Sequence, residues 1–152
     1  MTKSAGILVY RQHDLRTEYL LVHPGGPFWK NKDTNAWSIP KGEYTDSEEA
    51  ETAARREFEE ETGVRVTGIL VPLTPQKQKS GKLIVAFAGS FTVDADQIRS
   101  NLFEMEWPPR SGKKASFPEV DKAGWFTKQE ALEKIVTGQR PFLDELEKLM
   151  IE

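Results

Sequence analysis

Residues 42–64 read GEYTDSEEAETAARREFEEETGV, a run rich in alanine and glutamate between two glycines. Its alanines favour a helix, and Ser47 is the expected N-cap because a serine hydroxyl can accept a hydrogen bond from the first turn. Gly63 is expected to end the helix in the left-handed conformation. This segment therefore predicts one helix that closes at Gly63.

Three glutamates of this helix, Glu57, Glu60 and Glu61, are spaced so that they share one face. Like charges at this spacing repel each other, so a reason for them has to be sought. A solvated acidic face is one explanation. A site for a hard divalent cation, which prefers several carboxylate oxygens, is the other.

The longer pattern Gly-x5-Glu-x7-Arg-Glu-apolar-x-Glu-Glu-x-Gly-apolar matches at every position from Gly42 to Val64. This is the Nudix box, and the chain resembles the Nudix hydrolases, including the mutator-type (MutT-like) members. The resemblance implies an α/β fold, the Nudix fold, which is an α/β/α sandwich with a central mixed β-sheet. The order of expected strands and helices points to the same class.

The resemblance also implies roles for the charged residues of the box. Glu57, Glu60 and Glu61 become ligands of Mg²⁺ or Mn²⁺. Arg56 is expected to orient a ligand carboxylate, and Glu48 is expected to brace the loop through a charge pair.

Glu119 is the candidate for a further metal ligand, because mutator-type members carry a glutamate at a matching distance before the equivalent of Trp125. We expect it in a short loop before Trp125, with Glu104 and Glu106 as the next candidates. An exposed loop acid is the other explanation for Glu119.

The lead-in Trp37-Ser38-Ile39-Pro40-Lys41-Gly42 is similar to that of the subgroup acting on dinucleoside polyphosphates and diphosphoinositol phosphates. A phosphate contact is expected for Lys41, since a point cation suits phosphate oxygens. Gly42 is expected to allow a close backbone approach to the site.

Two aromatic residues, Phe28 and Trp29, lie in the segment HPGGPFWKNKDTN (23–35), whose prolines and glycines predict a loop. One hypothesis is that they stack on a substrate base. The other is that both pack against the edge of the core.

We therefore expect a Mg²⁺-dependent hydrolase that cleaves a pyrophosphate bond in a nucleoside diphosphate linked to another moiety. A dinucleoside polyphosphate or a nucleoside triphosphate is the favoured substrate. The tyrosine usual in dinucleoside-polyphosphate members is absent where Ser80-Gly81-Lys82 stands, and so is the Ser-Gln-Pro-Trp signature of pyridine-nucleotide hydrolases. Alternatives are 5′-RNA ends, diphosphoinositols, ADP-ribose, or a non-catalytic nucleotide-sensing domain on the same scaffold. A Nudix-type isomerase would require a site cysteine.

Composition sets further limits. The 152 residues are expected to form one domain, 1–152. The chain contains no cysteine, and its net charge of −3 gives no basic field for long nucleic acid. No apolar run suits a membrane span or a signal peptide, so a cytoplasmic enzyme without membrane contact is expected. Nothing in the composition selects an oligomeric state.

Outside the box the apolar pattern predicts strands and two further helices. The expected strands are 5–10, 19–22, 65–73, 83–93 and 102–107. A basic loop is expected at 108–116 and a helix at 128–136. A last helix is expected from Pro141, with Phe142, Leu146 and Leu149 facing inward.

Overall fold

The computed structural model describes residues 2–151. The elements follow in the order β1 (Lys3–His13), β2 (Arg16–Pro24), β3 (Lys41–Tyr44), α1 (Ala50–Thr62), β4 (Val71–Pro72), β5 (Gln76–Lys77), β6 (Leu83–Gly89), the 3-10 turn η1 (Ala95–Gln97), β7 (Leu102–Glu106), β8 (Lys114–Pro118), β9 (Val120–Thr127), α2 (Lys128–Lys134), the 3-10 turn η2 (Thr137–Gln139) and α3 (Arg140–Ile151).

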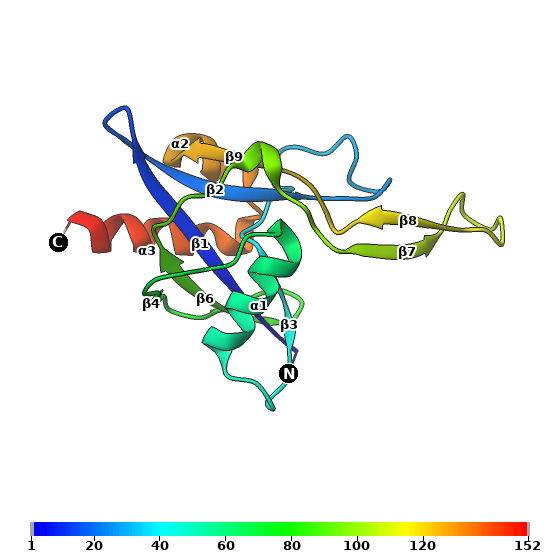
Figure 1. The fold of residues 1–152 in the computed structure, drawn as a ribbon, viewed down its shortest axis with the longest axis horizontal. Helices are drawn as coiled ribbons and strands as arrows, with labels where there is room; N and C mark the ends of the chain where they lie inside the picture. Colours follow the sequence, from blue (N-terminus) through cyan, green and yellow to red (C-terminus); the bar gives the residue numbers. More distant parts are fainter. Residues whose placement is uncertain (1, 152) are drawn as a thin grey trace.

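The main sheet is built around β1, its longest strand (Figure 1). On one side β1 runs parallel to β6. On the other side its first residues pair antiparallel with β3 and its last residues pair antiparallel with β2, which in turn pairs with β9. The central path is β4-β6-β1-β2-β9, with β3 and β5 attached beside it. The expected mixed sheet is confirmed.

Helices cover both faces of this sheet. Ala5, Ile7 and Val9 alternate along β1 and pack with Phe58 of α1 in one buried cluster. Leu8, between them, belongs to the opposite cluster, which contains residues of α2 and α3. Because successive side chains of a strand point to opposite faces, one strand serves both layers. The α/β/α sandwich predicted from the sequence is therefore confirmed.

A separate two-stranded hairpin, β7–β8, extends away from the main sheet (Figure 1). Its strands pair from Leu102 with Pro118 to Glu106 with Lys114. The prediction of a strand at 102–107 is confirmed. The prediction of a loop over 108–116 is wrong in its last residues, because Lys114 to Ser116 pair with β7 as part of β8.

Other boundaries differ from the sequence-based expectation. The helix of the box begins at Ala50 with Glu49 as N-cap, whereas the Ser47 hydroxyl contacts the Thr45 hydroxyl at 2.7 Å. Gly63 ends the helix at φ 77°, as predicted. Within the predicted strand 65–73 only Val71–Pro72 pair, because Gly68 adopts a left-handed φ of 91° that interrupts an extended strand.

Two predictions about the second half of the chain also need correction. Glu119 is followed directly by strand β9, in which Trp125 lies, instead of a loop. Leu149 is 43% exposed, and Leu143 packs inward with Phe142 and Leu146 instead.

No helix among residues 2–151 combines the length and the apolar character that crossing a membrane requires.

Candidate active site

Strand β3 passes so close to α1 that only a glycine at position 42 leaves room for the Glu57 carboxylate where it lies. A Cβ placed on Gly42 would lie 1.8 Å from Oε2 of Glu57, which no real contact allows. The close approach expected of Gly42 is therefore an approach to the Glu57 carboxylate. It brings the residues before the helix against the glutamate face.

Arg56 joins the glutamates of the helix to the loop before it. Its Nε and Nη2 donate to the two oxygens of Glu48 at 2.9 Å each. Its Nη1 donates to Glu57 at 2.7 Å and to both oxygens of Glu60 at 3.2 Å. The hydrogen bond from Arg56 lowers the pKa of the Glu48 carboxyl, and the bond to Glu48 is the largest of the contacts that raise the pKa of Arg56. The ion pair between Glu48 and Arg56 that was expected to brace the loop is present.

Glu61 stands apart from this arginine network. Its Oε1 accepts a hydrogen bond from the backbone N–H of Lys41 at 3.1 Å. Burial raises the pKa of the Glu61 carboxyl to about 8, against the opposing effects of the Lys41 N–H and ammonium. Burial likewise raises the pKa of Glu57. Two of the three helix glutamates therefore lie in surroundings that disfavour their negative charge.

Glu119, at the junction of β8 and β9, faces the same space. A cavity of about 140 Å³ is lined by both Glu61 and Glu119, together with Lys41 and residues of β2 and β9. Burial, followed by the charge of Glu60, raises the pKa of Glu119. The structure thus gathers Glu57, Glu60, Glu61 and Glu119 in one region. Glu104 and Glu106 lie on β7 as exposed residues of the hairpin and do not line this cavity.

Lys41 brings a cation to the carboxylates, and a second lysine, Lys82, lies near it. Burial and then the charge of Lys82 lower the pKa of Lys41, while Glu61 acts in the opposite direction. Lys82 precedes β6, which pairs with β1 on the side opposite β3. Sequence reasoning missed Lys82 because only the sheet topology brings the two lysines together.

The donor chemistry of the site fits Mg²⁺ or Mn²⁺. Carboxylate oxygens are the ligands these hard cations prefer, and the raised pKa values of Glu57, Glu61 and Glu119 indicate acidic charge that lacks full compensation. Among residues 2–151 no three acidic or imidazole side chains converge as a completed metal shell does. The Glu57 and Glu60 oxygens are instead turned to Arg56, and Glu61 to the Lys41 amide.

The two loop aromatics, Phe28 and Trp29, are placed differently from each other. Trp29 is partly buried and packs against the core beneath α2 and α3, as the packing hypothesis expects. Phe28 is 64% exposed and meets Trp29 edge-on at 5.1 Å between ring centroids. The Lys32 ammonium lies 3.5 Å from the centroid of the Phe28 ring and so covers one face of it. Their role as substrate-binding residues stays a prediction.

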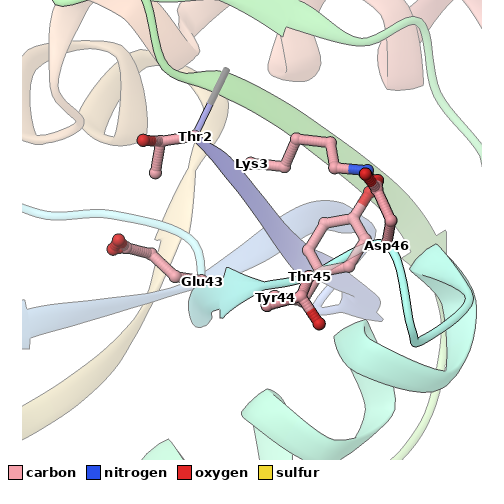
Figure 2. A pocket seen from close by; sticks show the side chains of 6 residues that line it. All are labelled: Thr2, Lys3, Glu43, Tyr44, Thr45 and Asp46. Atoms are coloured by element: carbon pink, nitrogen blue, oxygen red, sulfur yellow. The ribbon is translucent and has the colours of Figure 1, made fainter.

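A larger hollow of about 420 Å³ lies where β1 begins and β3 ends, away from these carboxylates (Figure 2). Lys3 reaches Asp46 there, whereas Glu43 points the other way (Figure 2). None of the box glutamates lines this hollow. Lys3 pairs with Asp46, and Glu43 lies 3.9 Å from Lys82, so the hollow offers no second cluster of carboxylates.

Comparison with known proteins decides the family. The model of the NUDIX domain matches residues 1–146, almost the whole chain. This chain belongs to the Nudix family. Nudix hydrolase 7 of Arabidopsis thaliana is 28% identical to it over 111 residues, which cover 69% of this chain and 38% of that protein. The RNA pyrophosphohydrolase of Caulobacter vibrioides (strain NA1000 / CB15N) is 35% identical over 68 residues, 41% of this chain and 40% of that protein. The matches thus span less than half of these curated relatives.

Solved Nudix structures share the fold along the full chain. The Ap4A hydrolase of C. elegans, in a binary complex, superimposes with a TM-score of 0.68 at 19% identity, covering 99% of this chain and 98% of that one. The NUDIX domain of Shewanella oneidensis NrtR, complexed with ADP ribose, gives a TM-score of 0.65 at 17% identity and covers 97% of this chain and 87% of that one. At these identities the likeness establishes the Nudix fold.

Proposed function

We propose that this Nudix protein hydrolyses a pyrophosphate bond in a nucleoside diphosphate derivative with the help of Mg²⁺ or Mn²⁺. The observation that carries the proposal is the gathering of Glu57, Glu60, Glu61 and Glu119 around Lys41, with Glu61 and Glu119 on one cavity. Such an excess of buried carboxylates costs folding stability, so it needs a functional explanation. A catalytic metal site explains it.

Pyrophosphate resists attack because its negative oxygens repel an incoming nucleophile. A divalent cation held by Glu57, Glu60, Glu61 and Glu119 would supply charge neutralisation and a more acidic water molecule. Glu57 and Glu60 would have to turn from Arg56, and Glu61 from the Lys41 amide, to bind it. Until then these hydrogen bonds hold the three helix carboxylates in place.

The other charged groups of the site orient the carboxylates and stabilise the charge on the phosphate. Arg56, fixed by Glu48, limits the orientations that Glu57 and Glu60 can take. Lys41 places its ammonium group against a phosphoryl oxygen, where negative charge must be stabilised. A carboxylate of the cluster accepts the proton of the attacking water, because a carboxyl with a raised pKa is a stronger base than an ordinary one.

The favoured substrate is a dinucleoside polyphosphate or a nucleoside triphosphate. The lead-in to the box, Trp37 to Gly42, supports the first, as does the likeness in fold to an Ap4A hydrolase. Both kinds of substrate carry a chain of phosphates, and two neighbouring lysines, Lys41 and Lys82, suit such a chain. A 5′-triphosphorylated RNA end carries the same phosphate chain, and one relative is an RNA pyrophosphohydrolase.

The test is phosphate or nucleotide release from a panel of diadenosine tetraphosphate, ATP, ADP-ribose and 5′-triphosphorylated RNA, with Mg²⁺ and with excess chelator. We expect turnover that stops with the chelator. Glu60→Gln is expected to lower kcat by on the order of 10²-fold or more, whereas Glu59→Gln, on an exposed face of the same helix, keeps activity. Full turnover in excess chelator contradicts the metal assignment. No turnover on any compound contradicts the hydrolase and favours the nucleotide-sensing alternative.

A further inference from the structure

A second cavity lies beside the carboxylate site, between the segment after β2 and the β7–β8 hairpin. It measures about 420 Å³, within the range of small-molecule sites. It is lined by Gly26, Pro27, Lys30, Trp107, Phe117, Pro118 and Asp121. We call this cavity the hairpin groove.

The hairpin presents an apolar face to this groove. Along β7 the partly buried Phe103 and Met105 alternate with exposed glutamates, and Trp107 continues the same alternation. On β8 Phe117 pairs with Phe103, so it shares that face. The Trp107 backbone N–H donates to the Lys113 carbonyl at 2.9 Å, which holds the tryptophan in the hairpin, and its side chain is still 39% exposed. An exposed indole on a hydrogen-bonded backbone is thus available at the groove.

The hairpin groove adjoins the carboxylate site. Pro24 and Glu119 line the cavity that contains Glu61, and their near neighbours Gly26 and Pro118 line the hairpin groove. The Gly25 N–H donates to the Glu119 carbonyl at 2.9 Å. This bond holds the segment after β2 against the junction of β8 and β9, between the two cavities. One residue, Pro118, separates Phe117 from Glu119, so these two lie at most about 7 Å apart along the chain. Trp107 stands further along the hairpin, one position past the Glu106–Lys114 pair, and lines the same groove as Pro118 and Asp121. A nucleoside lying in the groove can therefore extend from Trp107 toward Glu119.

We propose that the hairpin groove binds the base of the nucleotide substrate, with Trp107 stacked on it. This inference rests on the proposed function, which places the phosphates at Lys41 and the glutamates. A flat aromatic base suits walls formed by Trp107 and Pro27. One oxygen of Asp121 lies 2.9 Å from Nδ1 of His23, and its second oxygen is left to accept an exocyclic N–H of the base. An aliphatic group would make no use of that acceptor.

The test measures binding without hydrolysis. The probes are α,β-methylene-ADP and methylenediphosphonate, which carry the same non-cleavable phosphate unit with and without a nucleoside. Trp107→Ala is expected to weaken methylene-ADP binding by roughly 5- to 100-fold, the loss of one base–aromatic stack. Its affinity for methylenediphosphonate is expected to stay unchanged, and Trp107→Phe is expected to keep most of the methylene-ADP affinity.

Leu102→Ala is the matched control, because Leu102 is 66% exposed on the opposite face of the same hairpin, and it is expected to bind both probes normally. A second measurement does not depend on how Trp107→Ala folds. The indole N–H resonance of Trp107 is assigned by its absence in Trp107→Phe. Its chemical shift is expected to change when methylene-ADP is added and to remain the same when methylenediphosphonate is added.

The inference is overturned if a folded Trp107→Ala protein binds methylene-ADP as the wild type does. It is also overturned if the Trp107 indole N–H resonance does not shift when methylene-ADP is added. A base-specific loss in Trp29→Phe instead overturns it as well. The two proposals fail separately. Base-specific binding at Trp107 without turnover of any nucleotide contradicts the hydrolase alone, whereas turnover without a base-specific effect contradicts the hairpin groove alone.

Discussion

The carboxylate of Glu61 accepts a hydrogen bond from the backbone N–H of Lys41 at 3.1 Å, across 20 positions of sequence. This bond joins the last turn of α1 to the start of β3. The same two residues line one cavity with Glu119. The Glu61 carboxylate and the Lys41 backbone are therefore held together beside the space where a phosphate is expected.

The first prediction concerns pH and stability without divalent cation. Burial raises the pKa of Glu61 from 4.5 to about 8, so between these values the folded chain keeps a proton that the unfolded chain releases. The free energy of unfolding therefore falls as the pH rises from about 4.5 to about 8. Thermal melting in chelator across this range measures it. Glu61→Gln is expected to show a weaker dependence, and Glu59→Gln the dependence of wild type. Equal slopes for all three proteins contradict the buried position of Glu61.

The second prediction concerns Gly42. A methyl group at this position would meet the Glu57 carboxylate at 1.8 Å, so the Glu57 side chain has to leave its present position in Gly42→Ala. We expect a loss of stability on the order of 1–3 kcal/mol from overpacking and a fall in kcat. Thr45→Ala, at an exposed position just after β3, is the control and is expected to change neither. A Gly42→Ala protein with wild-type melting and turnover would show that β3 adapts without displacing Glu57.

The third prediction separates two neighbouring arginines. Arg56 contacts Glu48, Glu57 and Glu60, whereas Arg55 pairs with Glu51 on the surface. Removing a group that orients metal ligands costs about 10- to 100-fold in metal affinity or activity. We expect that loss in the Mg²⁺ dependence of Arg56→Ala and no loss in Arg55→Ala. Steady-state rates over a Mg²⁺ titration provide the measurement, and identical titrations for the two variants would remove Arg56 from the site.

The fourth prediction concerns Lys41. Its ammonium group faces Glu61 and lies near Lys82, so it is expected to act on the phosphate chain. Lys41→Ala should lower kcat, and more for diadenosine tetraphosphate than for ADP-ribose, because more charge lies near it in the longer chain. Lys79→Ala, an exposed loop lysine, serves as the control. If ADP-ribose is the best substrate and Lys41→Ala has no effect on it, the polyphosphate hypothesis is wrong and the hydrolase hypothesis remains.

The box region and the layer order could be predicted from the sequence because they depend on local signals. Gly63 ends its helix by a conformation that glycine adopts readily, and the alternation along β1 is a pattern of neighbouring residues. The box also predicted which glutamates would lie together. These features need no knowledge of distant contacts.

The errors lie where distant contacts decide the structure. Lys114 to Ser116 read as a basic loop and form a strand only because β7 pairs with them. Residues 65–73 read as a strand, yet Val66 and Leu70 are drawn into the cluster around α1 and leave only Val71–Pro72 to pair. Lys82 carried no local signal at all, since β1 brings it near Lys41 through pairing on both sides.

The β7–β8 hairpin shares no ladder with the main sheet, and this has a consequence for how the protein can diverge. Its residues bear few of the packing constraints that fix the strands beneath the helices, so insertions and exchanges there disturb the buried core little. The glutamates of α1, by contrast, are anchored to the sheet through Gly42 and Lys41. Mutation can therefore alter what the molecule recognises at the hairpin without rebuilding the part that would cleave the bond.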